Sequence, residues 1–100
     1  MAQALTVYAR IIAKSGQEAN LALALDEVAS KSMASGLCSR FDVLIDQSNP
    51  SCFALVETFF SGDHFREHMG TDHIEEFLKL VPNYVDSRES LFLEASDFSV

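Results

Sequence analysis

Three histidines lie within ten residues of one another in this 100-residue chain, at His64, His68 and His73. Histidine titrates near neutral pH, so it can act as a base, an acid or a hydrogen-bond donor. His68 stands three residues after Phe65 on a short predicted helix, a spacing that lets both side chains face an apolar pocket. A core histidine bonded to a backbone carbonyl fits the same spacing. If the chain does chemistry, we expect it around these residues.

A predicted helix break at Gly70 decides how His68 and His73 are related. On an unbroken helix, residues five apart point in directions that differ by about 140°. Only the break allows the two rings to converge, and we expect them to face different surroundings. His73 opens the following helix, where the helix dipole favours a neutral imidazole or a bound anion, so either a functional or a structural role fits it. We expect His64 to be exposed.

Glu57 is a carboxylate inside an otherwise apolar stretch, residues 52–60. If it is buried, it is either a general base with a raised pKa or half of an ion pair. We expect an ion pair with Arg10, Arg40 or Arg88, or a contact between subunits.

Aromatic residues offer a lining for a planar ring, although such spacings also occur in ordinary cores. Tyr8 shares a predicted strand face with Arg10, so its hydroxyl is placed to orient a substrate oxygen. The candidate lining residues are Phe53, Phe59, Phe65 and Phe77, with Tyr8 and Tyr84 beside them.

Alternation with period two predicts the strands, and apolar residues at helical spacing predict the helices. The longest helix carries an apolar stripe of Leu21, Leu25, Val28 and Ser32, and Gly36 closes it as a left-handed cap. The predicted elements are a strand over 4–13, a helix over 17–35, strands over 38–46 and 52–60, helices over 63–69 and 72–81, and a strand over 84–95.

Two prolines set boundaries in this prediction. Asn49 before Pro50 favours a turn over residues 47–51, which makes the flanking strands a hairpin. Pro82 with Asn83 ends the last helix.

This order of elements, β-α-β-β-α-β, is the ferredoxin-like arrangement, an α+β fold with an antiparallel sheet and helices on one face. The strand over 52–60 is apolar on both faces, which indicates a central strand covered on both sides. Because the helices cover only one face, we expect a second copy to pack sheet against sheet. The prediction is one domain over residues 1–100 that forms a homodimer.

The composition excludes several classes of partner. A formal net charge of −8 repels nucleic acids and acidic membranes. The N-terminal residues lack a basic signal region, and no apolar run is long enough to cross a bilayer, so we expect a cytoplasmic protein. Cys38 and Cys52 are expected to be buried thiols, although a disulfide becomes possible if they are neighbours on adjacent strands. No CxxC pair or glycine-rich phosphate loop is present, and we expect no metal and no cofactor.

Four stretches together resemble the antibiotic biosynthesis monooxygenase family of dimeric α+β barrels, over nearly the whole chain. They are Tyr8-Ala-Arg-Ile-Ile-Ala-Lys-Ser-Gly-Gln-Glu18, Gly36-Leu-Cys-Ser-Arg-Phe-Asp-Val-Leu44 with Asp46, Phe53-Ala-Leu-Val-Glu-Thr-Phe59, and Phe65-Arg-Glu-His-Met-Gly-Thr-Asp-His-Ile-Glu-Glu-Phe77.

The resemblance implies a homodimer with an apolar pocket between sheet and helices in each subunit. It also implies a cofactor-independent monooxygenase that oxidises a small aromatic or quinol-like substrate with O2. The protein would deprotonate the substrate, whose anion passes an electron to O2. On this hypothesis His68 is the first candidate for the catalytic group, followed by His73, Tyr8 and Glu57.

Two alternatives remain open. The stretch from Arg40 to Asp46 is similar to the autoinducer-2 phosphate isomerase branch, so the chain would be an isomerase or lyase acting on a small carbonyl compound. Ser61, where that branch has a basic residue, and the charge of −8 argue against an anionic substrate. The other alternative is a non-catalytic dimer that binds a small ligand. Haem degradation is disfavoured, because His68 and Leu78 stand where that branch has Trp and His.

Overall fold

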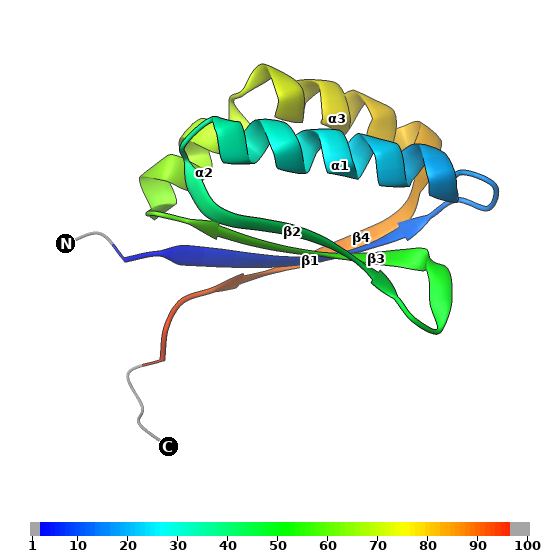
Figure 1. Cartoon of the computed structure of the whole chain (residues 1–100), viewed down its shortest axis with the longest axis horizontal. Coiled ribbons are helices and arrows are strands. Elements are labelled where there is room, and N and C mark those ends of the chain that lie inside the picture. The colour runs from blue at the N-terminus through cyan, green and yellow to red at the C-terminus, as the bar shows by residue number, and fades with distance from the viewer. Residues whose placement is uncertain (1–2, 97–100) are drawn as a thin grey trace.

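The computed structural model describes residues 3–96, and its four strands form one antiparallel sheet in the order β2-β3-β1-β4. The helices lie on one face of this sheet (Figure 1). This arrangement confirms the predicted α+β, ferredoxin-like fold. The elements are β1 Leu5–Ala13, α1 Glu18–Ala34, β2 Cys38–Asp46, β3 Asn49–Phe59, α2 Gly62–Met69, α3 Asp72–Tyr84 and β4 Val85–Leu93.

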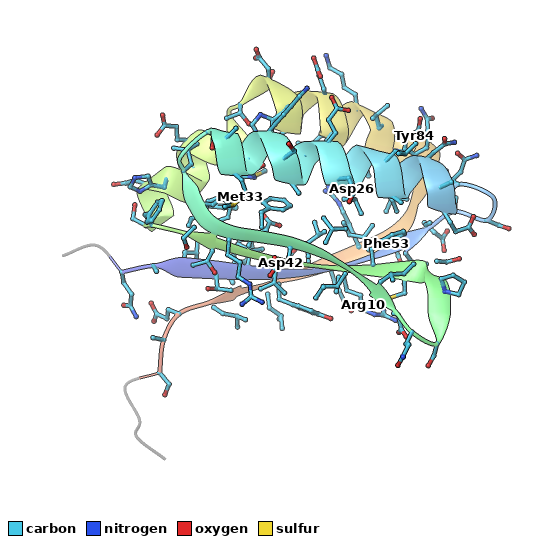
Figure 2. All side chains as sticks on the ribbon, viewed as in Figure 1. Arg10, Asp26, Met33, Asp42, Phe53 and Tyr84 are labelled. Carbon is cyan, nitrogen blue, oxygen red and sulfur yellow. The ribbon has the colours of Figure 1, made fainter. Side chains whose placement is uncertain are left out.

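The core lies between the sheet and the helices. Val7, Ala9 and Ile11 of β1 are buried against the helices, as alternation requires. The buried residues of α1 are the predicted stripe, Leu21, Leu25, Val28 and Ser32. Phe53 of β3 points towards the helices, whereas Arg10 of β1 lies on the opposite face (Figure 2).

Two boundaries differ from the sequence prediction. The predicted turn over 47–51 is shorter, because β3 already begins at Asn49, which pairs with Asp46. Proline is tolerated at the start of a strand, where its missing N–H costs least. At the other end of the chain, α3 continues through Pro82 to Tyr84.

Lys14 explains the extension of α3. Its ammonium donates to the carbonyl of Pro82 at 2.5 Å, and its backbone N–H donates to the carbonyl of Tyr84 at 2.8 Å. Carbonyls at the end of a helix have no partner within the helix. These two bonds satisfy them and fix the end of α3 beside β1.

Cys38 and Cys52 are both buried and both free. Cys38 pairs with Phe59 and Cys52 with Ile12, so the two thiols lie towards opposite ends of β3 and are not neighbours. A disulfide between them is therefore excluded. Burial raises the pKa of the Cys38 thiol. Among the described residues, no helix is long and apolar enough to cross a membrane.

The face of the sheet opposite the helices is uncovered within residues 3–96 (Figure 1). Two ion pairs lie on it, Arg10 with Glu89 and Arg40 with Asp42. Apolar side chains are exposed on the same face: Leu44 of β2 and Leu91 of β4 are 50% and 58% exposed. We call this surface the open face.

The backbone after α1 gives a first test of the fold. Gly36 has a φ of 77°, in the left-handed region, and a Cβ there would meet no atom within 4 Å. We expect Gly36→Ala to lower the free energy of unfolding by about 1–2 kcal/mol through backbone strain alone. Gly70→Ala is the control, because the φ of Gly70 is −94° and only ordinary contacts surround it. Equal losses in urea denaturation of the two variants would contradict this account.

Candidate functional site

A cavity of about 160 Å³ lies between the sheet and the helices. Its floor is formed by buried residues of β1 and β3, including Val7, Leu55 and Glu57. Its mouth is formed by residues that are exposed, including Met69 of α2 and Arg88 of β4. The lining is mostly apolar, and its buried polar side chains are Glu57 and His68.

Glu57 is placed in the floor by strand alternation. It lies opposite Val7 on one side and Phe41 on the other, so its side chain shares the helix-facing side of the sheet with theirs. It is only 7% exposed. Burial raises the pKa of this carboxyl from its ordinary 4.5 to about 7.

His68 is placed above Glu57 by α2. This helix begins where the Ser61 side chain accepts a hydrogen bond from the backbone N–H of His64 at 3.2 Å, a standard helix cap. His68 lies one turn later, 2% exposed, with its ring 4.7 Å from that of Phe59. Burial, and to a lesser extent the neighbouring His73, lower the pKa of His68 to about 4. No described group bonds to its Nδ1.

The His68 Nε2 and the Glu57 Oε1 lie 3.8 Å apart, too far for a direct hydrogen bond but close enough for a small adjustment to form one. With pKa values of about 7 and about 4, the carboxyl is partly protonated at neutral pH and the imidazole is uncharged. We call these two side chains the Glu57–His68 pair.

The expected ion pair between Glu57 and an arginine is not present among the described residues. Arg10 pairs with Glu89 and Arg40 with Asp42 instead, and both pairs lie on the open face. Alternation explains the difference, because Arg10 and Arg40 stand on the side of the sheet opposite Glu57.

His73 lies beside His68, with ring centroids 5.9 Å apart, which corrects the expectation that the two face different surroundings. The break after α2 redirects the chain, and the Thr71 hydroxyl stabilises it by donating to the His68 carbonyl at 2.7 Å. The His73 Nε2 is 3.2 Å from the Ser32 Oγ and 3.3 Å from the Thr71 Oγ1. Ser32 is fully buried, so α1 helps to hold the His73 ring.

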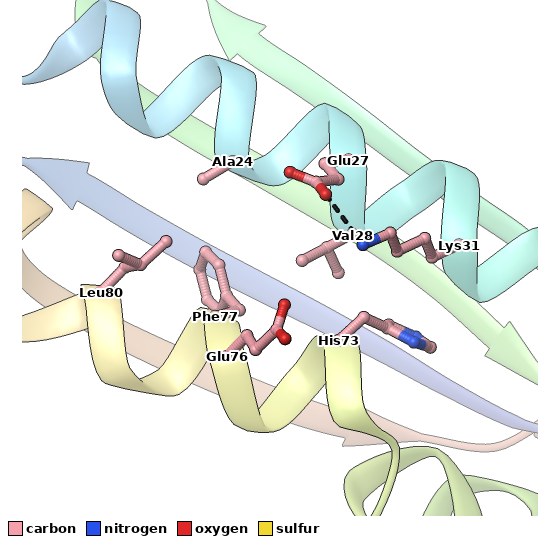
Figure 3. A pocket seen from close by; sticks show the side chains of 8 residues that line it. All are labelled: Ala24, Glu27, Val28, Lys31, His73, Glu76, Phe77 and Leu80. Atoms are coloured by element: carbon pink, nitrogen blue, oxygen red, sulfur yellow. Dashed lines mark ion pairs between the residues drawn. The ribbon is translucent and has the colours of Figure 1, made fainter.

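His73 also lines a second, smaller cavity of about 50 Å³ between α1 and α3 (Figure 3). Glu27 and Lys31 form an ion pair of 2.8 Å above it. This space is too small for an aromatic ring but has room for water. His73 therefore lies between His68, which lines the main cavity, and this smaller cavity between α1 and α3.

His64 is half-buried rather than exposed. Its Nδ1 lies 2.5 Å from the Ser61 Oγ, and its ring packs edge-on against Phe60. These contacts fix the start of α2.

The four candidate lining phenylalanines lie in two different surroundings. Phe65 and Phe77 line the cavity, whereas Phe53 and Phe59 are core residues outside it. Tyr8 lies on the open face, away from the Glu57–His68 pair, because it alternates with the buried residues of β1. Tyr84 does not line the cavity either.

Sequence reasoning did not identify most of the lining residues, among them Phe41, Arg88, Ser90 and Phe92. Phe41 could have been found, because it stands in register with Glu57. Arg88, Ser90 and Phe92 of β4 line the cavity at every second position, but nearly all of β4 is exposed, so its pattern carried little signal.

Comparisons with known proteins identify a matching family and several solved structures with the same fold. The sequence matches the model of a protein family described as antibiotic biosynthesis monooxygenase, over residues 4–80. No curated protein matches the sequence.

Solved structures with the same fold are similar along their whole length. The chain is similar to PA3566 from Pseudomonas aeruginosa, with a TM-score of 0.90 and 22% identity over 96% of this chain and 97% of that one. It is similar to SO0527 from Shewanella oneidensis, with a TM-score of 0.89 and 22% identity over 95% and 93% of the two chains. A protein named antibiotic biosynthesis monooxygenase has a TM-score of 0.85 and 20% identity over 92% and 98%. At these identities the structural likeness shows the fold alone.

The raised pKa of Glu57 predicts a specific pH dependence of stability. The unfolded carboxyl ionises near pH 4.5 and the folded one near pH 7, so the folded state loses stability as pH rises between these values. The loss is about 3 kcal/mol, from about 1.4 kcal/mol per pH unit. In Glu57→Gln this loss should disappear from urea unfolding curves, whereas the exposed-site control Glu89→Gln should behave like the natural chain. If the free energy of unfolding depends on pH in the same way in the natural chain and in Glu57→Gln, the raised pKa of Glu57 is refuted.

Proposed function

The chain belongs to the antibiotic biosynthesis monooxygenase family, and on that premise we propose that it oxidises a small aromatic or quinol-like substrate with O2. The observation that carries this proposal is the Glu57–His68 pair, an acid–base pair buried at the floor of an apolar, open-mouthed cavity.

The size of the cavity supports a substrate with one aromatic ring. An engineered apolar cavity of about 150 Å³ in another protein binds benzene, and the cavity here measures about 160 Å³. Phe41, Phe65 and Phe77 supply apolar surface and ring edges against which a planar substrate packs. Larger substituents would extend through the mouth.

The Glu57–His68 pair supplies the proton transfer. A general base works best when its pKa lies near the working pH, and that of Glu57 is about 7. In the proposed reaction the Glu57 carboxylate takes the proton of a substrate hydroxyl. The uncharged His68 then offers a hydrogen bond to the resulting phenolate. Both groups act in a site with little water, where such interactions are strong.

The oxidation balances with O2 as the only oxidant. The phenolate passes one electron to O2, and the resulting radicals combine at a ring carbon to form a peroxide. The O–O bond then breaks: one oxygen atom stays on the ring and the other leaves as water with two hydrogens of the substrate. A quinol and O2 thus become a hydroxyquinone and water. All electrons come from the substrate, so the proposal requires no flavin and no metal.

His73 has a secondary place in this proposal. It contacts the His68 ring and lines the smaller cavity between α1 and α3, so it can hold His68 in position and exchange protons with water in that cavity. Tyr8 has no such place within one chain, because it lies on the open face.

The same acid–base pair would also serve an isomerase or lyase, since removing a proton next to a carbonyl needs a base and a hydrogen-bond donor. O2 consumption separates the two functions. The phenylalanine lining favours the aromatic substrate.

Oxygen uptake with single-ring quinols tests the function. We expect uptake that depends on the protein, with kcat/KM rising with pH through about 7 as Glu57 ionises. Glu57→Gln and His68→Ala should each lower kcat/KM roughly a hundredfold or more. Glu67→Gln, at an exposed position of α2, is the control and should stay near the natural rate. Absence of uptake across hydroquinones, catechols and dihydroxynaphthalenes would overturn the oxygenase proposal, and turnover of carbonyl compounds under nitrogen would support the isomerase.

We also propose that the open face packs against a second copy of the chain. It exposes Leu44 and Leu91 together with two ion pairs, and interfaces between subunits likewise combine apolar and charged side chains. Leu91→Asp should therefore convert a dimer into a monomer in light scattering at micromolar concentration. Leu23→Asp is the control, because Leu23 is 70% exposed on α1, away from the sheet. A natural chain that is already monomeric would refute this arrangement.

A further inference from the structure

Arg88 differs from the other arginines of the chain. The other three each pair with a carboxylate: Arg10 with Glu89, Arg40 with Asp42 and Arg66 with Asp63. Within residues 3–96, the Arg88 side chain has no ion pair and no hydrogen bond. The chain has 15 acidic and 7 basic residues, so carboxylate partners are abundant. A guanidinium left unpaired in such a chain is available for a ligand.

Arg88 lies at the mouth of the main cavity. It stands opposite Ile11 on the helix-facing side of the edge strand β4, and its side chain lines the cavity. Ser90 and Phe92 follow it on the same side of β4. Ser90 therefore adds a hydroxyl donor on the same side of β4 as Arg88. Phe92 adds an aromatic ring whose centroid lies 5.5 Å from that of Phe65.

Register places Arg88 and the Glu57–His68 pair at opposite ends of the cavity. Glu57 shares a row across the sheet with Val7 and Phe92, and Arg88 lies four residues before Phe92. The distance along the strand is roughly 13 Å, and the distance across two strand spacings is roughly 10 Å. Together these components put the two Cα positions roughly 16 Å apart. A flexible arginine side chain, one ring and a short spacer span that distance.

We infer that the substrate carries a carboxylate on a short chain attached to its ring, which Arg88 and Ser90 bind at the mouth while a ring hydroxyl meets the Glu57–His68 pair. This inference rests on the proposed function and names its substrate class. Arginine binds a carboxylate with two parallel hydrogen bonds, which fixes orientation as well as affinity.

The net charge of −8 does not contradict an anionic substrate. Exposed charges are screened beyond about 8 Å at physiological salt, so a guanidinium in direct contact outweighs carboxylates that lie farther away. Those carboxylates still slow the approach of an anion at low salt. We therefore expect Arg88 to strengthen binding of an anionic substrate, and the surface carboxylates to weaken it slightly.

Binding under nitrogen tests the inference without requiring turnover. The probes are hydroquinone propionate and its primary amide, which have nearly the same shape and differ in charge. By calorimetry, the natural chain should bind the acid at least tenfold more tightly than the amide. Arg88→Gln should weaken binding of the acid roughly ten- to a hundredfold, the range for one charged hydrogen-bonded contact, and leave the amide unchanged. Arg66→Gln removes the same charge away from the cavity and should change neither.

The outcomes separate this inference from the oxygenase proposal. If the acid binds no more tightly than the amide, or if Arg88→Gln weakens both equally, the carboxylate subsite is refuted even where quinols are oxidised. If the acid binds through Arg88 but no O2 is consumed in air, the subsite stands and the oxygenase proposal fails. In an active protein, Arg88→Gln should raise KM for the acid and leave kcat and the KM of the amide unchanged. A change in kcat for both substrates would show a structural effect.

Discussion

A carboxyl group buried in the middle of an apolar sheet is the constraint on which this structure depends. Glu57 occupies a position where a valine or leucine would pack without cost, and burial disfavours its charged form by about 3 kcal/mol at neutral pH. The rest of the fold must offset this cost. Its near neighbours, Phe41, His68 and the apolar floor, leave little water around it. The same desolvation gives the group a pKa in the range where it can exchange a proton.

Much of the fold could be predicted from the sequence, because its patterns are local. Alternation in β1 and β2 and the stripe on α1 predicted these elements, and the turn and helix-end signals predicted their order. One of the two boundaries that differed had a non-local cause. The extension of α3 past Pro82 depends on Lys14, 68 residues earlier, whose bonds satisfy the end of the helix. The position of a proline in the sequence cannot by itself predict that contact.

The candidate site was only partly predictable. Residues 57–73 hold both members of the Glu57–His68 pair, and the histidines marked that region. The contact between the His68 and His73 rings depends on the angle between α2 and α3. The geometry of a single helix does not predict that angle. Phe53 and Phe59 looked equivalent to Phe65 and Phe77, and only packing separates core from cavity. Arg88 was one of three arginines considered as a partner for Glu57, whereas register places it at the far end of the cavity.

The exposure of β4 has a consequence for evolvability. Arg88, Ser90 and Phe92 reach the cavity from an edge strand and are exposed, so substitutions there usually change stability by less than about 0.5 kcal/mol. Glu57 and His68 lie in the core, where most substitutions are costly. Substitutions along β4 can therefore change the mouth of the cavity while the proposed Glu57–His68 pair stays the same. A new ligand preference would arise on β4 long before the chemistry of the floor changed.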